Sequence, residues 1–149
     1  MKAVVQRVKS ASVRVNQEIV GAIDHGLLVL LGISVNDTPK QVLQLSRKVA
    51  NLRIFADQNA PMNIDVKAVG GDVLVVSQFT LHAQTKKGNR PSFIEAAAGE
   101  KAEPLYLEFI RCLQLETGRT MQTGRFGADM SVALVNDGPV TIILDTDQY

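Results

Sequence analysis

The sequence predicts an α+β fold, in which one mixed or antiparallel sheet accompanies two main helices within a single domain of residues 1–149. Two observations predict this class. Short apolar runs separated by turn residues occupy both ends of the chain and are typical of strands. Two stretches repeat apolar residues every three or four positions, as one face of a helix requires. Because strands and helices do not alternate along the chain, a parallel βαβ architecture is disfavoured.

The amino-terminal part predicts a hairpin followed by a central strand. Residues 13–15 alternate apolar and polar side chains, residues 16–18 suit a turn, and residues 19–23 suit the returning strand. A second turn at residues 24–26 leads into residues 27–33 (LLVLLGI). These are apolar on both faces and are therefore typical of a strand in the middle of a sheet.

The first helix is predicted to begin at Pro39. Asp37 or Thr38 suits the N-cap, and proline is favoured at the first helical position that follows. The residues after it form one apolar helical face, made of Val42, Leu45, Val49 and Leu52.

The middle of the chain predicts short strands and a long loop. Residues 53–55 (RIF) and 62–64 (MNI) suit short strands around a turn at residues 57–60. Residues 73–81 (VLVVSQFTL) are strongly β-prone, and residues 82–93 form a polar loop.

The second helical region is expected from about Ser92, with a break near Gly99 and a restart at Pro104. Gly118 suits the C-cap of this helix. Its apolar stripe consists of Leu105, Phe109 and Leu113.

The last two apolar runs, residues 130–135 and 140–145, flank Asn136-Asp137-Gly138-Pro139 and predict two strands joined by a turn. A tight hairpin turn does not need Pro139, which cannot donate a hydrogen bond to the ladder of the returning strand. Either the turn is an ordinary one at a sheet edge, or the Gly138-Pro139 backbone is presented to a binding partner.

Composition excludes several classes of protein. The net charge of +1 gives no global reason to expect nucleic-acid or membrane binding. The single cysteine, Cys112, excludes an intrachain disulfide, and its position beside Phe109 predicts a buried, unreactive thiol. The opening residues mix charged with apolar side chains, unlike a signal peptide, and the longest apolar run is too short to cross a bilayer. We therefore expect a soluble cytoplasmic protein.

Most familiar catalytic motifs are absent. There is no GxxxxGK[ST] phosphate loop, no GxGxxG motif after a strand and no GxSxG elbow. The two histidines, His25 and His82, fall in turn or loop contexts without an HExxH motif or a cysteine partner, so no metal or cofactor is expected. Spacing alone does not exclude a Ser-His-Asp triad, although neither histidine has an evident partner.

Three stretches carry groups that suit catalysis or binding. SQFTL, at residues 77–81, ends an apolar strand with hydroxyls, an amide and an aromatic ring, which can orient an ester or a water. TKKGNRP places Lys86, Lys87 and Arg90 around a glycine, where a phosphate backbone can dock. The third is the segment at residues 136–139. Taken singly, the first stretch is better explained as a strand leaving the core, the second as a solvated loop and the third as a plain turn.

In combination and in this order, SQFTL, KKGNRPSF, TGRFGADM and LVNDGPVT resemble the D-aminoacyl-tRNA deacylase family. The opening QRVKSASVRV, the glycine-flanked run at residues 26–32 and the pair RIF and MNI are also similar to that family. The resemblance thus covers essentially the whole chain, and both signature patterns, SQ-F-T and N-x-G-P-x-T, are intact. His82 departs from the pattern, because a small residue is expected directly after SQFTL.

The resemblance implies an enzyme that hydrolyses the ester between a D-amino acid and the 3′ terminal adenosine of tRNA, and that also removes mischarged glycine. It implies a β-barrel-like α+β fold and a homodimer with active sites at the interface, without a membrane or DNA partner. In this family the Gly138-Pro139 bond is expected to be cis and to reach from one subunit into the pocket of the other. Its carbonyls would bind the substrate's α-ammonium group, and the side chain of an L-amino acid would collide with the backbone.

The resemblance also suggests roles for individual residues. In the catalytic segment, the hydroxyl of Thr80 is expected to position groups rather than attack, and backbone N–H groups near Ser77–Phe79, with Gln78 between them, are expected to form an oxyanion site. Because no side chain resembles a tuned general base, the terminal ribose 2′-OH is expected to assist. Two alternatives stay open, a non-catalytic module that binds RNA ends and a general esterase with Ser77 as nucleophile. The residues expected to bind substrate or support the Gly-Pro motif are Phe79, Gly138, Pro139, Arg7 and Met130.

Overall fold

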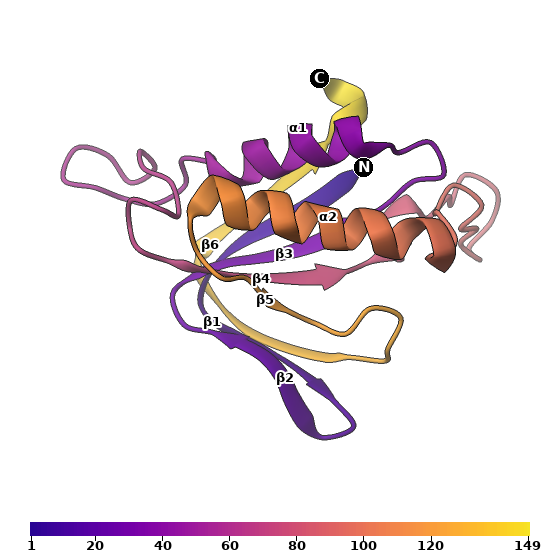
Figure 1. The fold of residues 1–149 in the computed structure, drawn as a ribbon, viewed down its shortest axis with the longest axis horizontal. Coiled ribbons are helices and arrows are strands. Elements are labelled where there is room, and N and C mark those ends of the chain that lie inside the picture. Colours follow the sequence, from indigo (N-terminus) through magenta and orange to yellow (C-terminus); the bar gives the residue numbers. More distant parts are fainter.

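The computed structural model describes residues 1–149, and its two helices lie side by side across one face of a curved sheet (Figure 1). β1 is the organising strand, because β2, β3 and β6 all pair with it in antiparallel fashion. β4 then pairs with β3, and β5 with β4, both in parallel, so the sheet is mixed. The six strands are β1 (Lys2–Val15), β2 (Glu18–Ile23), β3 (Gly26–Gly32), β4 (Asp72–Ser77), β5 (Gln122–Thr123) and β6 (Ser131–Asp145).

The sheet is nearly closed as a barrel because β1 changes partners along its length. Its first half pairs with β3, and its second half pairs with β2 in a hairpin. This curl brings β2 against β5, where a side chain on Gly21 would overlap the carbonyl of Thr123. The barrel-like α+β class is therefore confirmed. The space inside the curl is filled by Val8, Ala11, Val13, Ile23, Leu28, Leu74 and Val76.

The first helix, α1 (Pro39–Ala50), has the predicted cap. The Thr38 hydroxyl accepts a hydrogen bond from the Lys40 N–H at 3.3 Å, and the Gln41 side chain accepts one from the Thr38 N–H at 3.0 Å. No helix of the structure is long and apolar enough to span a membrane. The main core lies between the helices and the sheet and includes the predicted apolar faces, namely Val42, Leu45 and Val49 of α1 and Leu105, Phe109 and Leu113 of α2.

The second helix, α2 (Gly99–Thr117), begins later than expected and contains Pro104 without a break. Pro104 lies close to the start of the helix, so the missing N–H removes one backbone hydrogen bond, and the buried stripe that follows keeps the segment helical. Gly118 is the C-cap, with a left-handed φ of 68°, as predicted. The short strands expected at residues 53–55 and 62–64 are reduced to one bridge between Phe55 and Ile64.

The β-prone segment that was expected to continue to residue 81 ends as a strand at Ser77. The Gln78 N–H completes the pairing by donating to the Leu31 carbonyl at 2.7 Å. The Leu81 N–H then turns back to the Gln78 carbonyl at 3.2 Å, which starts the 3-10 helix η1 (Phe79–His82).

The prediction of two strands joined by a turn at the carboxyl end is wrong, because residues 131–145 form one strand along β1. Gln6 pairs with Thr141 and Val8 with Asn136, so the four residues 137–140 face Arg7 alone and form a wide bulge. Pairing with β1 on both sides of the bulge overrides the local turn signal. The Gly138-Pro139 bond within it is cis, and both residues are exposed.

Candidate active site

A hollow of about 480 Å³ opens at the ends of β3 and β4, beside the start of α2. Strand residues such as Leu31 and Val76 line it, and the loop after β5 contributes Phe126 and Met130. Most of the lining is apolar, with a small number of polar groups, which is the usual form of a small-molecule site.

Ser77, Gln78 and Phe79 line one wall of this hollow, and Thr80 follows them directly in the chain. Ser77 and Gln78 are half-buried, whereas Phe79 and Thr80 are exposed. The Gln78 side-chain amide donates a hydrogen bond to the Thr80 hydroxyl at 2.5 Å. Because the Thr80 oxygen accepts this bond, its own proton is left to donate to another group. The Phe79 ring packs edge-to-face on Phe93, with 5.1 Å between ring centroids.

One backbone N–H group of the expected oxyanion site is not available to a substrate. The Gln78 N–H is already bonded to the Leu31 carbonyl and is not free. The first N–H groups of a helix have no acceptor within it, so those of Phe79 and Thr80, at the start of η1, are the ones that remain.

No histidine contacts the hydroxyls of the segment. His82 follows it directly but is buried, and its Nε2 has no hydrogen-bond partner. His25 lies elsewhere, with its Nε2 3.8 Å from a carboxylate oxygen of Asp137. A Ser-His-Asp triad is therefore not assembled. No three His, Cys, Asp or Glu side chains converge to hold a metal ion, and catalysis without a metal stays a prediction.

The bulge of β6 is held from behind by Arg7. The Arg7 Nε donates to the Asp137 carbonyl at 3.1 Å and lies 3.3 Å from the Asp137 carboxylate, while another N–H donates to the Ile54 carbonyl at 2.5 Å. Gly138 has a φ of 125°, and a Cβ there would lie 3.0 Å from the Val140 side chain and 3.1 Å from Arg7. Only glycine suits this backbone, which is fixed on its inner side and open to solvent on its outer side.

The predicted site residues form two groups that do not meet within one chain. Ser77 lies level with Leu31 and Ala3, whereas Gly138 faces Arg7, four positions farther along β1. Four strand residues correspond to about 13 Å, and two further strands separate β4 from β6. One group consists of Ser77, Gln78, Phe79, Thr80 and Met130, and the other of Arg7, Gly138 and Pro139.

A family model described as D-Tyr-tRNA(Tyr) deacylase matches residues 4–145 of this chain. The chain belongs to this family. A D-aminoacyl-tRNA deacylase of Flavobacterium psychrophilum is 55% identical over 146 residues, which cover 98% of this chain and 97% of that protein. One of Desulfatibacillum aliphaticivorans is 56% identical over 146 residues, covering 98% and 99%. The predicted resemblance and the predicted membership of a hydrolase family are thereby confirmed.

Two solved structures share the deacylase fold. One is named c-Myc DNA Unwinding Element Binding Protein and is 44% identical, with a TM-score of 0.92 over 98% of this chain and 99% of the other. The second is a probable eukaryotic D-amino acid tRNA deacylase, with a TM-score of 0.84 over 96% and 97% of the two chains. At 15% identity, the second shows the fold alone.

Sequence reasoning did not predict all the residues of this candidate site. Asp129 is the only charged side chain that lines the hollow, and its negative charge favours a cationic group there. The Phe126 ring packs against the Tyr106 ring at a tilt of 47°, with 5.5 Å between ring centroids, and the Tyr106 hydroxyl donates to the Val75 carbonyl at 2.9 Å. Burial raises the pKa of Tyr106 to about 12, so it stays a protonated donor beneath the site. Phe126 and Asp129 lie in the stretch TGRFGADM, which matches the family, but no local pattern in that stretch predicts a role for either residue.

Proposed function

We propose that this chain hydrolyses the ester bond of D-aminoacyl-tRNA, releasing free D-amino acid and tRNA, and that it also removes glycine mischarged on tRNA. One observation carries the proposal, namely a hollow lined by Ser77, Gln78 and Phe79 together with an exposed Gly138-Pro139 bulge in a member of this family. Its volume of about 480 Å³ suits an aminoacyl group with part of the terminal adenosine. The chain would act as one domain in the cytoplasm, where tRNA is charged.

The chemical step needs little from the protein because an aminoacyl ester is already activated. The oxygen of a water adds to the ester carbonyl carbon, the bond from that carbon to the ribose oxygen breaks, and the ribose oxygen takes a proton. Thr80, whose proton is free because Gln78 donates to its oxygen, would orient the water or the carbonyl. The N–H groups of Phe79 and Thr80 would stabilise the negative carbonyl oxygen. The terminal ribose 2′-OH would assist in place of a side-chain base.

Selection of the D-enantiomer would depend on close approach of the substrate to the backbone at Gly138. Carbonyl groups of the bulge would accept hydrogen bonds from the α-ammonium group, and Asp129 would add favourable charge. The α-hydrogen of a D-amino acid fits against the backbone, whereas an L side chain collides. Glycine has no side chain and is accepted. The contacts of Arg7 with Asp137 and Ile54 support this role, because they fix the bulge.

The separation of the two groups within one chain supports a two-fold homodimer, in which the Gly138-Pro139 bulge of each subunit enters the hollow of the other. Strand β6 provides a surface for such a contact. It is 15 residues long and pairs with β1 on one edge only. Val135 and Ile143 on it are 54% and 74% exposed. A long edge with exposed apolar side chains needs to be covered in a stable protein.

The basic loop is proposed to contact phosphates of the tRNA. Lys86, Lys87 and Arg90 are exposed in a loop that is closed by a bridge between Gln84 and Ser92. The loop follows η1 directly and therefore borders the rim of the hollow. Replacing all three cations by alanine should raise KM and reduce the slope of log affinity against log salt by about 2–3.

The decisive test compares hydrolysis of D-tyrosyl-tRNA, L-tyrosyl-tRNA, glycyl-tRNA and the ethyl ester of D-tyrosine. We expect rapid release from D-tyrosyl-tRNA and glycyl-tRNA, and little from the other two. Tight binding of tRNA without turnover would instead favour an RNA-end binding module, and equal cleavage of the free ester would favour a general esterase. One relative is named for DNA binding. We therefore add duplex DNA as a competitor and expect no loss of rate, because the net charge of +1 provides no broad basic surface.

The dimer is tested separately. Light scattering should give twice the chain mass of 16.2 kDa. A Gly138→Ala chain mixed with a Gln78→Ala/Thr80→Ala chain should regain about a quarter of the wild-type sites, because half of the dimers are mixed and each has one intact site. A monomer with full activity would refute the shared site.

A further inference from the structure

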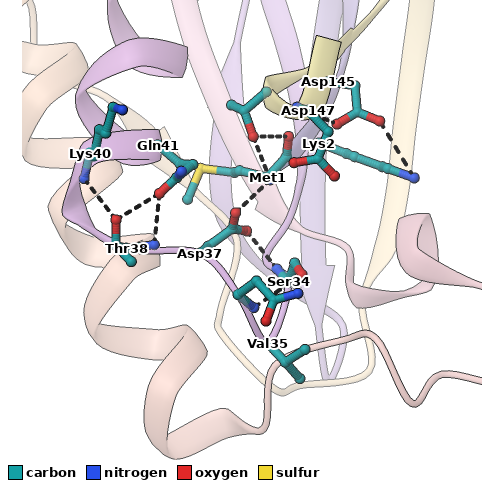
Figure 2. Close-up of polar contacts among 12 residues, drawn as sticks. Met1, Lys2, Ser34, Val35, Asp37, Thr38, Lys40, Gln41, Asp145 and Asp147 are labelled. Atoms are coloured by element: carbon teal, nitrogen blue, oxygen red, sulfur yellow. Dashed lines mark hydrogen bonds and ion pairs between the residues drawn. The ribbon is translucent and has the colours of Figure 1, made fainter. Parts of the chain in front are cut away.

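The amino group of Met1 lies in the interior of the protein (Figure 2). Met1 is 1% exposed, and its ammonium nitrogen is 2.6 Å from an oxygen of the Asp37 carboxylate and 2.8 Å from the Thr146 hydroxyl. Asp37 and Thr146 are themselves 3% and 6% exposed. The other Asp37 oxygen accepts a hydrogen bond from the Ser34 N–H at 2.6 Å. The Thr146 N–H donates to the Met1 carbonyl at 3.0 Å, so both the amino group and the carbonyl group of Met1 are hydrogen-bonded.

The ammonium is the only cation that balances Asp37. The carboxylate makes one ion pair, with the Met1 nitrogen, whereas the neighbouring Lys2 side chain turns to Asp145 at 3.6 Å. A buried carboxylate without a positive partner is strongly unfavourable. Asp37 was one of two candidates for the N-cap of α1, but Thr38 takes that role, which leaves Asp37 for the amino terminus.

We propose that Asp37 and Thr146 form a built site for a free α-ammonium group, so that the fold is completed only when Met1 carries an unmodified amino group. A formyl or acetyl group would convert the cation into a neutral amide and would need space that the buried site does not offer. In hosts that start chains with formylmethionine, deformylation must precede the completed fold. In that hydrolysis water adds to the formyl carbon, the C–N bond breaks, formate leaves and the amine takes up a proton.

The site is connected to the wall of the hollow. Asp37 holds the Ser34 N–H, and Ser34 directly follows Ile33, whose carbonyl accepts a hydrogen bond from the Ala97 N–H at 2.9 Å. Ile33 and Ala97 both line the hollow. Loss of the ammonium would therefore loosen this side of the hollow as well as the carboxyl terminus.

The test compares three forms of the full chain that differ only at their ends. One has a free Met1, one carries Gly-Ser before Met1, and the control carries Gly-Ser after Tyr149, which is 55% exposed. The amino-terminal extension should lower Tm by at least about 5 °C, because it removes the cation from a buried pair, while the control should stay within about 1 °C of the first form. A smaller effect of the amino-terminal extension would overturn the proposal.

Two sets of variants show whether the effect acts through this site. Asp37→Asn combined with the extension should lower Tm little more than either change alone, because both remove the same pair, and full additivity would overturn the proposal. Thr146→Val should lower Tm, whereas Thr146→Ser, which keeps the hydroxyl, should not, and equal melting of the two would also count against it. When deformylation is inhibited, the chain that retains its formyl group by mass spectrometry should melt at least about 5 °C below the deformylated chain, and equal Tm of the two forms would overturn the proposal. None of these readouts depends on hydrolysis of a substrate.

Discussion

Replacing Gly138 with alanine adds one methyl group to the fixed inner side of the β6 bulge. The φ of 125° is rarely adopted by residues with a side chain and costs about 1–3 kcal/mol. The new Cβ would lie 3.0 Å from Val140 and 3.1 Å from Arg7, and Arg7 cannot retreat freely because it also binds the Ile54 carbonyl. At about 2–4 °C per kcal/mol for a chain of this size, Tm should fall by about 2–12 °C.

The same change should reduce activity by more than the loss of stability explains. The methyl group is accommodated only if the bulge moves away from Arg7, which displaces the carbonyls that are proposed to bind the substrate. A displacement of about 1 Å at a reacting centre costs up to 100-fold in rate, so we expect release of D-tyrosine from D-tyrosyl-tRNA to fall about 10- to 100-fold. Rates are compared well below Tm, so that only folded protein is measured.

Gly118→Ala is the matched control. Gly118 also has a positive φ, of 68°, but it ends α2, and a Cβ there meets no atom within 4 Å. This variant should lose about 1 kcal/mol of stability and keep its hydrolysis rate. A wild-type rate for Gly138→Ala, or an equal loss of rate for Gly118→Ala, would refute the assignment of the bulge to the active site.

Further outcomes are expected for other groups. The Thr80→Ala variant should keep measurable hydrolysis, whereas tRNA with a 2′-deoxy terminal adenosine should react far more slowly with the wild-type chain. A larger loss of rate from Thr80→Ala than from the 2′-deoxy substrate would refute the substrate-assisted mechanism. Exhaustive chelation should leave the rate unchanged, and a loss would reveal a metal. Burial raises the pKa of Tyr106 to about 12, from about 10 in the unfolded chain. The contribution of the protonated Tyr106 to the free energy of unfolding is therefore complete below pH 10 and is lost between about pH 10 and 12. Ultraviolet titration of Tyr149→Phe, which leaves Tyr106 as the only tyrosine, should show this midpoint. Burial also raises the pKa of the Cys112 thiol, so thiol reagents should label it only after unfolding.

Elements whose signals are local were predictable from the sequence. Thr38, Pro39 and an apolar face specify α1, and an uninterrupted apolar run specifies the central strand β3. The segment at residues 136–139 carries an equally strong local signal, for a turn, yet it lies within a strand because β1 pairs on both sides of it. Pairing between segments at opposite ends of the chain has no local signature, so this error follows from reading one stretch at a time.

The site follows the same division. Ser77, Gln78 and Thr80 are predicted as site residues because hydroxyl and amide groups at the end of an apolar strand are unusual and match a family motif. The opposite wall of the hollow includes Ala97, whose small apolar side chain carries no chemical signal. The role of Asp37 was also missed, because a residue before a helix is first interpreted as a cap, and the partner that decides its role is Met1.

The pairing of β1 with β6 also determines when the protein can start to work during its synthesis. Lys2 faces Asp145, so β1 has as one of its partners β6, which is made after every other strand of this sheet. At about 5–20 residues per second, Lys2 waits roughly 7–29 s for Asp145. Closing so long a loop costs about 4 kcal/mol of chain entropy. The strands and helix start that line most of the hollow are made earlier, but Gly138 and Pro139 arrive only with the last strand. A nascent chain thus has most of the pocket before it has the groups proposed to tell D- from L-amino acids, and selectivity is acquired only once Gly138 and Pro139 have been made.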